Sequence, residues 1–327
     1  MENSGFSMRA WQVLTLGDAP RRVTIPYPQP QPGEVMVKVG AAGLNFADLL
    51  MMDGRYQDRP ALPYIPGMEI AGVVEAVGPG ADGPRPGTRV IGVCGTGGLA
   101  EMVCVPTGRL VVMPDTMPMT VGAGFQIAYG TSHLALTHKA SLQPGETLFV
   151  TGAAGGVGLT AVEIGKRLGA RVIASARGHD RIAVAKAAGA DVVVDATAPG
   201  LKETLRSLGG VDVVYDTVGG PAFDEALRAC KPDGRLLAIG FASGHVPQVP
   251  ANVLLVKNLT VTGFWYGGYQ KTLPPLVADS MRQLLGWYSD GGLSPHVSHV
   301  LPFDGLVEGL DLLRNRTATG KVVITVA

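Results

Sequence analysis

The stretch TLFVTGAAGGVGLTAVEIGKRLGARVIASAR, from Thr147 to Arg177, decides the fold. A short apolar run, Leu148–Val150, precedes a glycine-rich turn, and apolar residues then recur at helical spacing until Gly169, a residue type that commonly ends a helix. Arg171–Ala174 has the composition of a second strand. Strand, glycine turn, helix and strand form a βαβ unit, which is the context that a dinucleotide-binding turn requires.

The turn departs from the usual dinucleotide fingerprint at its first glycine, where Ala153 stands, so the pattern is A-x-G-x-x-G. Gly155 lets the backbone approach a pyrophosphate, and the helix that follows offers free N–H groups at its N-terminus. Gly158 lets the helix pack closely against the strand. A flexible loop is the alternative interpretation, but the βαβ context favours dinucleotide binding. The residues expected to contact the cofactor here are Ala154, Gly155, Gly156 and Val157.

The end of the second strand indicates which dinucleotide binds. An NAD site commonly carries Asp or Glu there, about 20 residues along, to accept from the ribose hydroxyl. This chain has Ser175-Ala176-Arg177 instead, and Arg181 follows one helical turn later. An acidic residue would repel a 2′-phosphate, whereas a guanidinium binds it with two hydrogen bonds. Unless the two arginines only line a solvated helix face, the sequence predicts NADPH, with Ser175, Arg177 and Arg181 in its site.

Length, charge and cysteine content exclude several classes of protein. A chain of 327 residues suggests two domains. Lys+Arg and Asp+Glu are both 27, so no basic surface for nucleic acid is expected. Cys94, Cys104 and Cys230 are too widely spaced to predict a disulfide framework or a C-x-x-C metal site.

We find no apolar run of membrane-spanning length and no secretory signal, so we expect a cytoplasmic protein in which Met1–Ser7 is a disordered leader.

The predicted fold class is α/β with two domains. Many short strands with glycine and proline turns before residue 125 predict a small irregular barrel, in which Asn45–Asp53 is helical. Strands and helices alternate from 125 to 268, which predicts a doubly wound parallel sheet of about six strands. The tail from 269 has one clear strand, near 321–326, and is expected to return to the first domain. The predicted domains are therefore 1–124 with 269–327, and 125–268.

Six motifs, in order along the chain, carry a resemblance to a known family: NFAD at Asn45–Asp48, PGMEIAG at Pro66–Gly72, YGT at Tyr129–Thr131, the AAGGVG turn, DTVGG at Asp216–Gly220 and TGKV at Thr319–Val322. With them the chain resembles the medium-chain dehydrogenase/reductase superfamily along nearly its whole length, and most closely its zinc-lacking NADPH:quinone oxidoreductase (zeta-crystallin) branch. The resemblance implies a GroES-like irregular β-barrel catalytic domain and a Rossmann NADPH-binding domain. It leaves the substrate open among quinones, enones and acyl-CoA thioesters.

The resemblance also implies that no catalytic zinc is bound. Zinc-dependent relatives have cysteine, histidine and cysteine where this chain has Asn45, Met68 and Ile127, and none of these supplies a thiolate or an imidazole. Glu69 is kept, but one carboxylate does not hold zinc. The cysteine-rich lobe that binds structural zinc in those relatives retains only Cys94.

The family pattern implies further site residues. Asn45 and Thr131 are expected near the nicotinamide and its ribose, although Asn45 is also a typical turn residue and Thr131 a typical helix cap. Tyr56 stands where relatives carry an active-site tyrosine, with a core aromatic as the alternative; Leu50 replaces a second tyrosine of some relatives. The remaining expected cofactor contacts are Val218, Gly240, Phe241, Phe264, Trp265 and Lys321.

These residues predict a reductase. Without a metal to polarise an alcohol, hydride transfer from NADPH to an electron-poor π-system is favoured. We expect quinones or related α,β-unsaturated carbonyls as substrates, with acryloyl-CoA or another enoyl-CoA as the alternative. A protein of another class, which binds NADPH without turnover as crystallin-type or RNA-binding relatives suggest, is the third hypothesis, and the neutral charge counts against RNA.

The last strand of the predicted parallel sheet, Leu259–Gly263, indicates a homodimer. An uncovered sheet edge exposes unpaired N–H and C=O groups, and Asn258 and Thr260 provide no charge to guard it. Pairing with the same edge of a second copy would cover these groups, and relatives commonly dimerise in this way. The alternative is that the tail helix near Met281 covers the edge within one chain.

Overall fold

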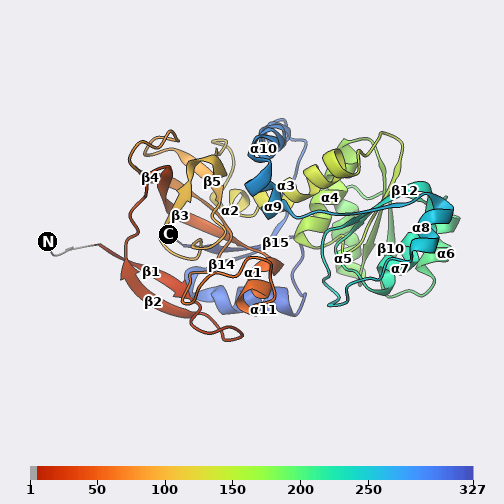
Figure 1. Ribbon diagram of the computed structural model, residues 1–327, viewed down its shortest axis with the longest axis horizontal. Helices are drawn as coiled ribbons and strands as arrows, with labels where there is room; N and C mark the ends of the chain where they lie inside the picture. Colours follow the sequence, from red (N-terminus) through yellow and green to blue (C-terminus); the bar gives the residue numbers. More distant parts are fainter. Residues whose placement is uncertain (1–5, 327) are drawn as a thin grey trace. The chain divides into compact units, whose positions relative to one another are not determined.

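The computed structural model describes residues 6–326, which form two compact units (Figure 1). Unit 1 is Met1–Ile127 with His296–Ala327, and unit 2 is Ala128–Pro295. Most of the predicted leader lies outside the described residues, but its last residue, Ser7, already begins strand β1. Among residues 6–326, no helix combines the length and apolar character needed to cross a bilayer.

Unit 1 is built on a seven-stranded sheet in the order β14-β15-β3-β4-β5-β7, with β6 also paired to β3. Its neighbours run antiparallel except for the parallel pair β14 and β15. Separately, β1 (Ser7–Gln12) and β2 (Arg21–Pro26) form a two-stranded sheet. The strands of the large sheet are β3 (Glu34–Leu44), β4 (Glu69–Val77), β5 (Arg89–Val93), β6 (Met102–Pro106), β7 (Leu110–Val112), β14 (Val297–Pro302) and β15 (Lys321–Thr325).

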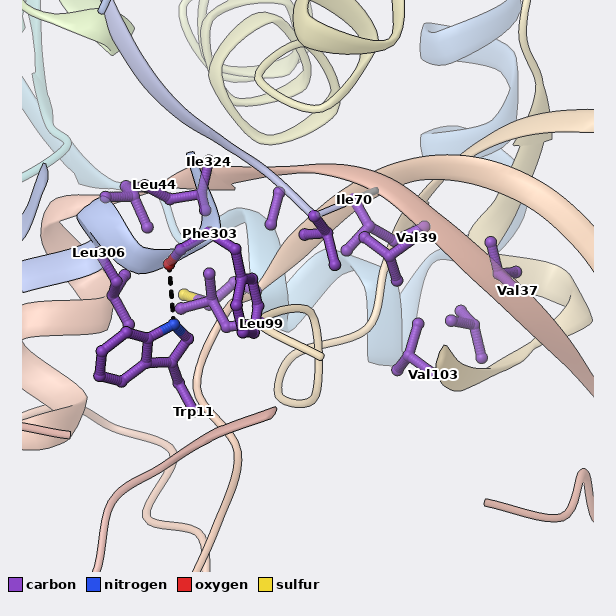
Figure 2. Close-up of a cluster of buried hydrophobic side chains, with 14 of the residues drawn as sticks. Trp11, Val37, Val39, Leu44, Ile70, Leu99, Val103, Phe303, Leu306 and Ile324 are labelled. Atoms are coloured by element: carbon purple, nitrogen blue, oxygen red, sulfur yellow. Dashed lines mark hydrogen bonds between the residues drawn. The ribbon is translucent and has the colours of Figure 1, made fainter. Parts of the chain in front are cut away.

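Small residues in β3 let other chain segments approach it closely. A Cβ on Gly43 would lie 2.2 Å from the carbonyl oxygen of Ala123, so only glycine fits there. The core of unit 1 lies against this strand, where Leu44, Ile70 and Ile324 are buried (Figure 2). Trp11 closes the core by donating its indole N–H to the Phe303 carbonyl at 3.0 Å (Figure 2).

The helical segments of unit 1 are short, as expected for a domain of strands and turns. The predicted helix is present as α1, and Asp48 in its first turn accepts the Asn45 backbone N–H at 2.8 Å, which satisfies a donor at the helix start. The helical segments are α1 (Phe46–Met52), η1 (Thr107–Arg109), α2 (Met119–Gly122), η3 (Phe303–Gly305) and α11 (Leu306–Arg314).

Unit 2 contains the predicted doubly wound sheet, whose six strands are all parallel and follow the order β10-β9-β8-β11-β12-β13. Helices flank it (Figure 1). The chain leaves β8 in one direction to β9 and returns on the other side as β11, and ligands of such sheets bind at this switch point. The strands are β8 (Thr147–Val150), β9 (Arg171–Ala176), β10 (Val192–Asp195), β11 (Val211–Asp216), β12 (Cys230–Ala238) and β13 (Thr260–Gly263).

The helices of unit 2 follow the predicted alternation with the strands. A π-helical segment, η2 (Ala135–Lys139), continues α3 before β8 is reached. The α-helices are α3 (Gln126–Leu134), α4 (Gly156–Arg167), α5 (His179–Ala187), α6 (Leu201–Ser207), α7 (Pro221–Ala229), α8 (Ala251–Lys257), α9 (Tyr266–Thr272) and α10 (Pro274–Ser289).

The second domain boundary lies at 295/296 and not at 268/269, because α10 packs within unit 2. Ser280 of this helix lies 2.8 Å from Nδ1 of His133 on α3. Just beyond the helix, Asp290 accepts from Arg167 at 2.6 Å, and Arg167 also lies over the Trp287 ring. From residue 296 onward the chain belongs to unit 1, where β14 and β15 join the large sheet.

Candidate cofactor and active site

Two glycines of the turn after β8 and one in the first turn of α4 are needed, or left free, for different structural reasons. Gly152 has φ +59°, and a Cβ there would lie 2.5 Å from the Thr217 hydroxyl oxygen. A Cβ on Gly158 would lie 2.3 Å from the carbonyl oxygen of Gly152, so this glycine allows helix and turn to pack. Gly155 differs, because its φ is −81° and the nearest atom to a Cβ would be at an ordinary 3.4 Å. Internal packing therefore does not require Gly155, and its exposed backbone is open to a ligand.

The N-terminus of α4 is suited to an anion. The first helical hydrogen bond runs from the Leu159 N–H to the Gly155 carbonyl at 2.9 Å. The N–H groups of Gly156, Val157 and Gly158 come before it and have no acceptor within the helix. Together with the positive end of the helix dipole, these groups provide the site that a pyrophosphate uses at a βαβ turn. The residues present thus fit a dinucleotide, with Ala154 buried beneath the turn.

A buried carboxylate holds the neighbouring loop in place. Asp216, at the end of β11, accepts from the Thr151 hydroxyl at 2.6 Å and from the Gly219 N–H at 2.8 Å. Thr217 donates its N–H to the Thr151 hydroxyl and its own hydroxyl to the Thr151 carbonyl, each at 2.9 Å. Burial raises the pKa of Asp216 above its usual value, although these hydrogen bonds lower it. The loop that carries Val218 is thereby fixed to the end of β8. Asp216 begins the DTVGG motif that carries the family resemblance, but the sequence assigned it no role in the site, although an acid followed by Thr and glycines at a strand end was a usable signal.

The residues expected to bind the 2′-phosphate lie at the end of β9 and in α5, the helix that follows it. Ser175 is buried in the strand, whereas Arg177 is exposed immediately after it and Arg181 follows in α5. In the register of the two strands, Ala176 faces Asp195 of β10. The pKa of Asp195 is lowered by hydrogen bonds from Thr197 and also by the charge of Arg177. Sequence reasoning missed this carboxylate because only the pairing of strands brings it to the site.

Except for Thr131, which lies in α3, the other expected cofactor contacts of unit 2 follow the carboxyl ends of parallel strands, so they share one sheet edge with the glycine turn. The Gly240 N–H donates to the Asp216 carbonyl at 3.3 Å, and the Phe264 N–H donates to the Ala238 carbonyl at 3.1 Å. Phe241 is 41% exposed, as a ligand-facing side chain would be, whereas Phe264 and Thr131 are buried. The set at or near this edge is Val218, Gly240, Phe241, Phe264 and Trp265.

In unit 1, residues from three distant segments meet in a buried polar cluster, which we call the Lys321 cluster (Lys321, Asn45, Glu69 and Asp48). The Lys321 ammonium donates to the Leu44 carbonyl at 2.9 Å, and to Asn45 Oδ1 and Glu69 Oε1 at 2.8 Å each. All three of its donors therefore have acceptors inside unit 1, so a cofactor contact through Lys321 would have to replace one of them.

The second carboxyl of the Lys321 cluster belongs to Asp48. Its Oδ2 accepts the Asn45 backbone N–H, while Oδ1 is buried without a hydrogen-bond partner in the described part of the chain. Burial is the main cause that raises the pKa of Asp48 to about 7, and the nearby Lys321 charge opposes this rise. A carboxyl with this pKa takes up a proton within the neutral range.

The three positions at which the family resemblance places zinc ligands in zinc-dependent relatives lie in or next to the Lys321 cluster in the chain or through a hydrogen bond. Asn45 belongs to it, Met68 is buried next to Glu69 in the chain, and the Ile127 N–H donates to Glu69 Oε2 at 3.0 Å. Cys94 donates its thiol to the Gly67 carbonyl at 3.3 Å, and burial raises its pKa to about 12. Within residues 6–326, no group of three or more His, Cys, Asp or Glu side chains is arranged to hold a metal ion.

Tyr56 also lies in unit 1, where it is half-buried and packs against the hydrophobic core. The structure therefore supports its packing role and leaves its expected role towards a substrate carbonyl as a prediction. The neighbouring Arg55 forms an ion pair with Asp53 at 2.5 Å on the surface.

Comparison with known proteins gives the family. The family model described as an alcohol dehydrogenase GroES-like domain matches residues 31–115, and the one described as a zinc-binding dehydrogenase matches 156–282. A quinone oxidoreductase-like protein 2 homolog from Nematostella vectensis is 38% identical over 297 residues, which are 89% of this chain and 81% of that protein. The chain belongs to the quinone oxidoreductase branch of the medium-chain dehydrogenases/reductases.

Solved structures of family members have the same fold. The quinone oxidoreductase from Thermus thermophilus, solved alone and with NADPH, is 36% identical with a TM-score of 0.86, covering 97% of this chain and 100% of that one. A mycobacterial protein solved with NADPH is 31% identical with a TM-score of 0.91, covering 97% and 99% of the two chains. The GroES-like domain and the parallel-sheet domain predicted from the sequence are thus confirmed.

Proposed function

We propose that the protein is an NADPH-dependent, zinc-independent reductase that transfers hydride to quinones or related α,β-unsaturated carbonyls. The observation that carries the proposal is the open backbone of Gly155 at the N-terminus of α4, on the sheet edge where β9 leads into Arg177. Membership of the quinone oxidoreductase branch, and relatives solved with NADPH, support the same cofactor here.

The residues of unit 2 divide the binding of NADPH between them. The N–H groups of Gly156 and Val157 would bind the pyrophosphate, and Arg177 with Arg181 would bind the 2′-phosphate. Bound NADPH supplies a hydride from its nicotinamide ring. The exposed Phe241 and the fixed loop of Val218 would orient that ring, because both follow strand ends at the same edge.

The donor chemistry of unit 1 supports a reaction without zinc. Asn45, Met68 and Ile127 offer an amide, a thioether and an alkyl group where a catalytic zinc needs thiolates or imidazoles. Oxidation of an alcohol needs its oxygen to be polarised, whereas a quinone or enone is already electron-poor and accepts hydride with less help. On the family resemblance, we assign Asn45 and Thr131 to the nicotinamide end of the cofactor. Tyr56 is assigned to the substrate carbonyl, as a hydrogen-bond donor.

A steady-state assay tests the function. Purified protein is given NADPH or NADH with 9,10-phenanthrenequinone or with acryloyl-CoA, with and without a chelator. We expect NADPH oxidation with the quinone, at an unchanged rate in chelator. Turnover of acryloyl-CoA alone would move the substrate class to enoyl thioesters. NADPH binding without turnover of either compound would contradict a reductase, and loss of activity in chelator would contradict zinc independence.

We also propose that the protein is a homodimer joined through β13. This strand ends the sheet of unit 2 and pairs only with β12 among the described residues. On the preceding helix, α8, Leu255 and Val256 are 78% and 77% exposed, which is unusual for adjacent large apolar side chains. The tail helix α10, which was the alternative cover for this sheet edge, instead contacts α3 through Ser280 and α4 through Trp287. An exposed edge beside exposed aliphatic side chains is the surface that a second copy would cover.

A further inference from the structure

The Lys321 side chain is fixed both at its ammonium and along its aliphatic stem. Its three hydrogen bonds are 2.8–2.9 Å long and go to the adjacent residues Leu44 and Asn45 at the end of β3 and to Glu69 at the start of β4. Its aliphatic stem runs past Gly124, where an added Cβ would lie 3.0–3.2 Å from three carbons of the lysine. The side chain is only 9% exposed. A lysine bound in this way cannot swing out to solvent without breaking an ion pair with a buried carboxylate.

The neighbours of the Asn45 side chain determine the orientation of its amide. Oδ1 faces the Lys321 ammonium, which can only donate, and Nδ2 lies 3.0 Å from Glu69 Oε1, which accepts. A flipped amide would direct its NH2 group at the ammonium and its oxygen at the carboxylate. Both contacts would be repulsive, so only one orientation is compatible with the charged pair.

Glu69 is fixed in turn by the backbone. Its Oε2 accepts the Ile127 N–H at 3.0 Å, while Oε1 receives the two donors from Lys321 and Asn45. The carboxylate is 1% exposed and therefore needs a positive partner. A positive charge surrounded by the oxygens of Leu44, Asn45 and Glu69 is the arrangement that a small bound cation would adopt, and here a lysine provides it.

We propose that Lys321 is a positioning residue whose buried ammonium acts as a built-in cation and holds the Asn45 amide in a single orientation. The proposal rests on the proposed function only in one respect, namely that Asn45 contacts the cofactor. In this role Lys321 touches neither NADPH nor substrate. By fixing the amide, Lys321 determines whether the oxygen or the nitrogen of the Asn45 side chain is presented to NADPH and to the substrate.

The first experiment reads the Asn45 amide directly and does not depend on activity. The chain has five asparagines, Asn3, Asn45, Asn252, Asn258 and Asn315, so selective ¹⁵N-asparagine labelling gives few side-chain signals. We expect one NH2 pair that exchanges slowly with solvent and is absent from Asn45→Asp. In Lys321→Met this pair should shift and exchange at least tenfold faster. Lys38→Met, which removes an exposed lysine from β3, is the matched control and should leave the pair unchanged.

The second experiment separates positioning from charge balance. Lys321→Met leaves Glu69 without its partner, so the double variant Glu69→Gln/Lys321→Met is made as well to remove both charges. We expect the double variant to recover thermal stability but to keep a kcat lowered on the order of 10- to 100-fold, because misoriented groups cost rate. Its NADPH Kd should stay within about threefold, since all three donors of the Lys321 ammonium are already taken by acceptors of unit 1. In Lys321→Ala, added propylammonium should restore turnover and 1-propanol should not.

The outcomes are distinguishable. If the Asn45 signals are the same in Lys321→Met as in the unsubstituted protein, the positioning role is wrong, whatever the substrate. If the double variant recovers kcat together with stability, Lys321 only balances charge, and the proposal is also wrong. If the unsubstituted protein reduces neither quinone nor enoyl-CoA, the proposed function fails, while the NMR result still decides what Lys321 does.

Discussion

Asp195 lies directly opposite Ala176 in the parallel pairing of β10 and β9, so a carboxylate lies beside Arg177, the next residue of the chain. The same edge thus carries a positive group that would attract a 2′-phosphate and a negative group that would repel it. The balance between them sets how strongly the site distinguishes NADPH from NADH, and each can be changed separately.

Replacing Arg177 should remove the preference for NADPH. A charge-assisted pair with phosphate contributes about 1.5–3 kcal/mol, so Arg177→Ala should weaken NADPH binding roughly 10- to 100-fold and leave NADH binding nearly unchanged. Both Kd values are measured by fluorescence titration. Arg171→Ala, at the amino end of the same strand, is the matched control. Equal affinities for NADPH and NADH in the unsubstituted protein would contradict the assignment of the cofactor.

Replacing Asp195 should have the opposite effect. Asp195→Asn keeps an oxygen that can accept from Thr197, as the carboxylate does at 2.9 Å, but removes the negative charge beside Arg177. We expect NADPH to bind about two- to fivefold more tightly, a small change because the groups are exposed to solvent. The change should disappear in the Arg177→Ala background if Asp195 acts through that arginine. An unchanged Kd in the single variant would show that the carboxylate has no part in selecting the cofactor.

Gly155 and Gly158 should respond differently to alanine. Gly155→Ala introduces a Cβ with ordinary contacts, so the melting temperature should hardly change, but the methyl group stands in the way of a pyrophosphate and NADPH should bind at least tenfold more weakly. Gly158→Ala places a Cβ 2.3 Å from a carbonyl oxygen, so the protein should lose on the order of 1–3 kcal/mol of stability. Thermal melts and NADPH titrations of the two variants check both effects. Equal losses of stability would contradict the separate roles.

Stability should depend on pH through Asp48. Its pKa is raised from 3.8 in the unfolded chain to about 7 in the fold, so between these values the folded protein binds the extra proton. The contribution of Asp48 to the free energy of unfolding is therefore present at low pH and is lost as the pH rises towards 7, by an amount on the order of a few kcal/mol. Urea unfolding from pH 5 to 7.5 should show this slope in the unsubstituted protein and not in Asp48→Asn. Asp82→Asn, in an exposed loop, is the control, and identical slopes in all three would contradict the prediction.

The dimer should depend on the apolar face of α8. Leu255→Glu with Val256→Glu places charges on two side chains that are already exposed, so folding should be unaffected while the charges prevent a second copy from covering them. Light scattering at micromolar concentration should change from a dimer mass to a monomer mass. Val307→Glu, 41% exposed in unit 1, is the control and should remain dimeric. A monomer mass for the unsubstituted protein would remove the case for the interface.

Features that depend on local patterns could be predicted from the sequence. The glycine turn and the alternation of apolar segments with helices are local, and they led to the parallel sheet and to its last strand. The boundary at 296 could not be predicted, because α10 is an ordinary amphipathic helix whose partners, such as His133, lie far away in the sequence. Nothing near Lys321 in the chain reveals that it pairs with Glu69, 252 residues earlier. Asp195 was missed for the same reason, since only the strand register brings it beside Arg177.

The discontinuity of unit 1 dictates an order of events during synthesis. Unit 2 is one continuous segment and can fold once residue 295 has emerged from the ribosome, whereas β3 must wait for β15, with which it pairs from Val322 opposite Leu44. Until then Asn45 and Glu69 lack their cation, and the earliest-made part of the chain remains incomplete longest. A nascent chain from which unit 2 has emerged but β15 has not would carry a finished unit 2 and an open, apolar β3 edge. Such a nascent chain is a ready substrate for chaperones and a starting point for aggregation.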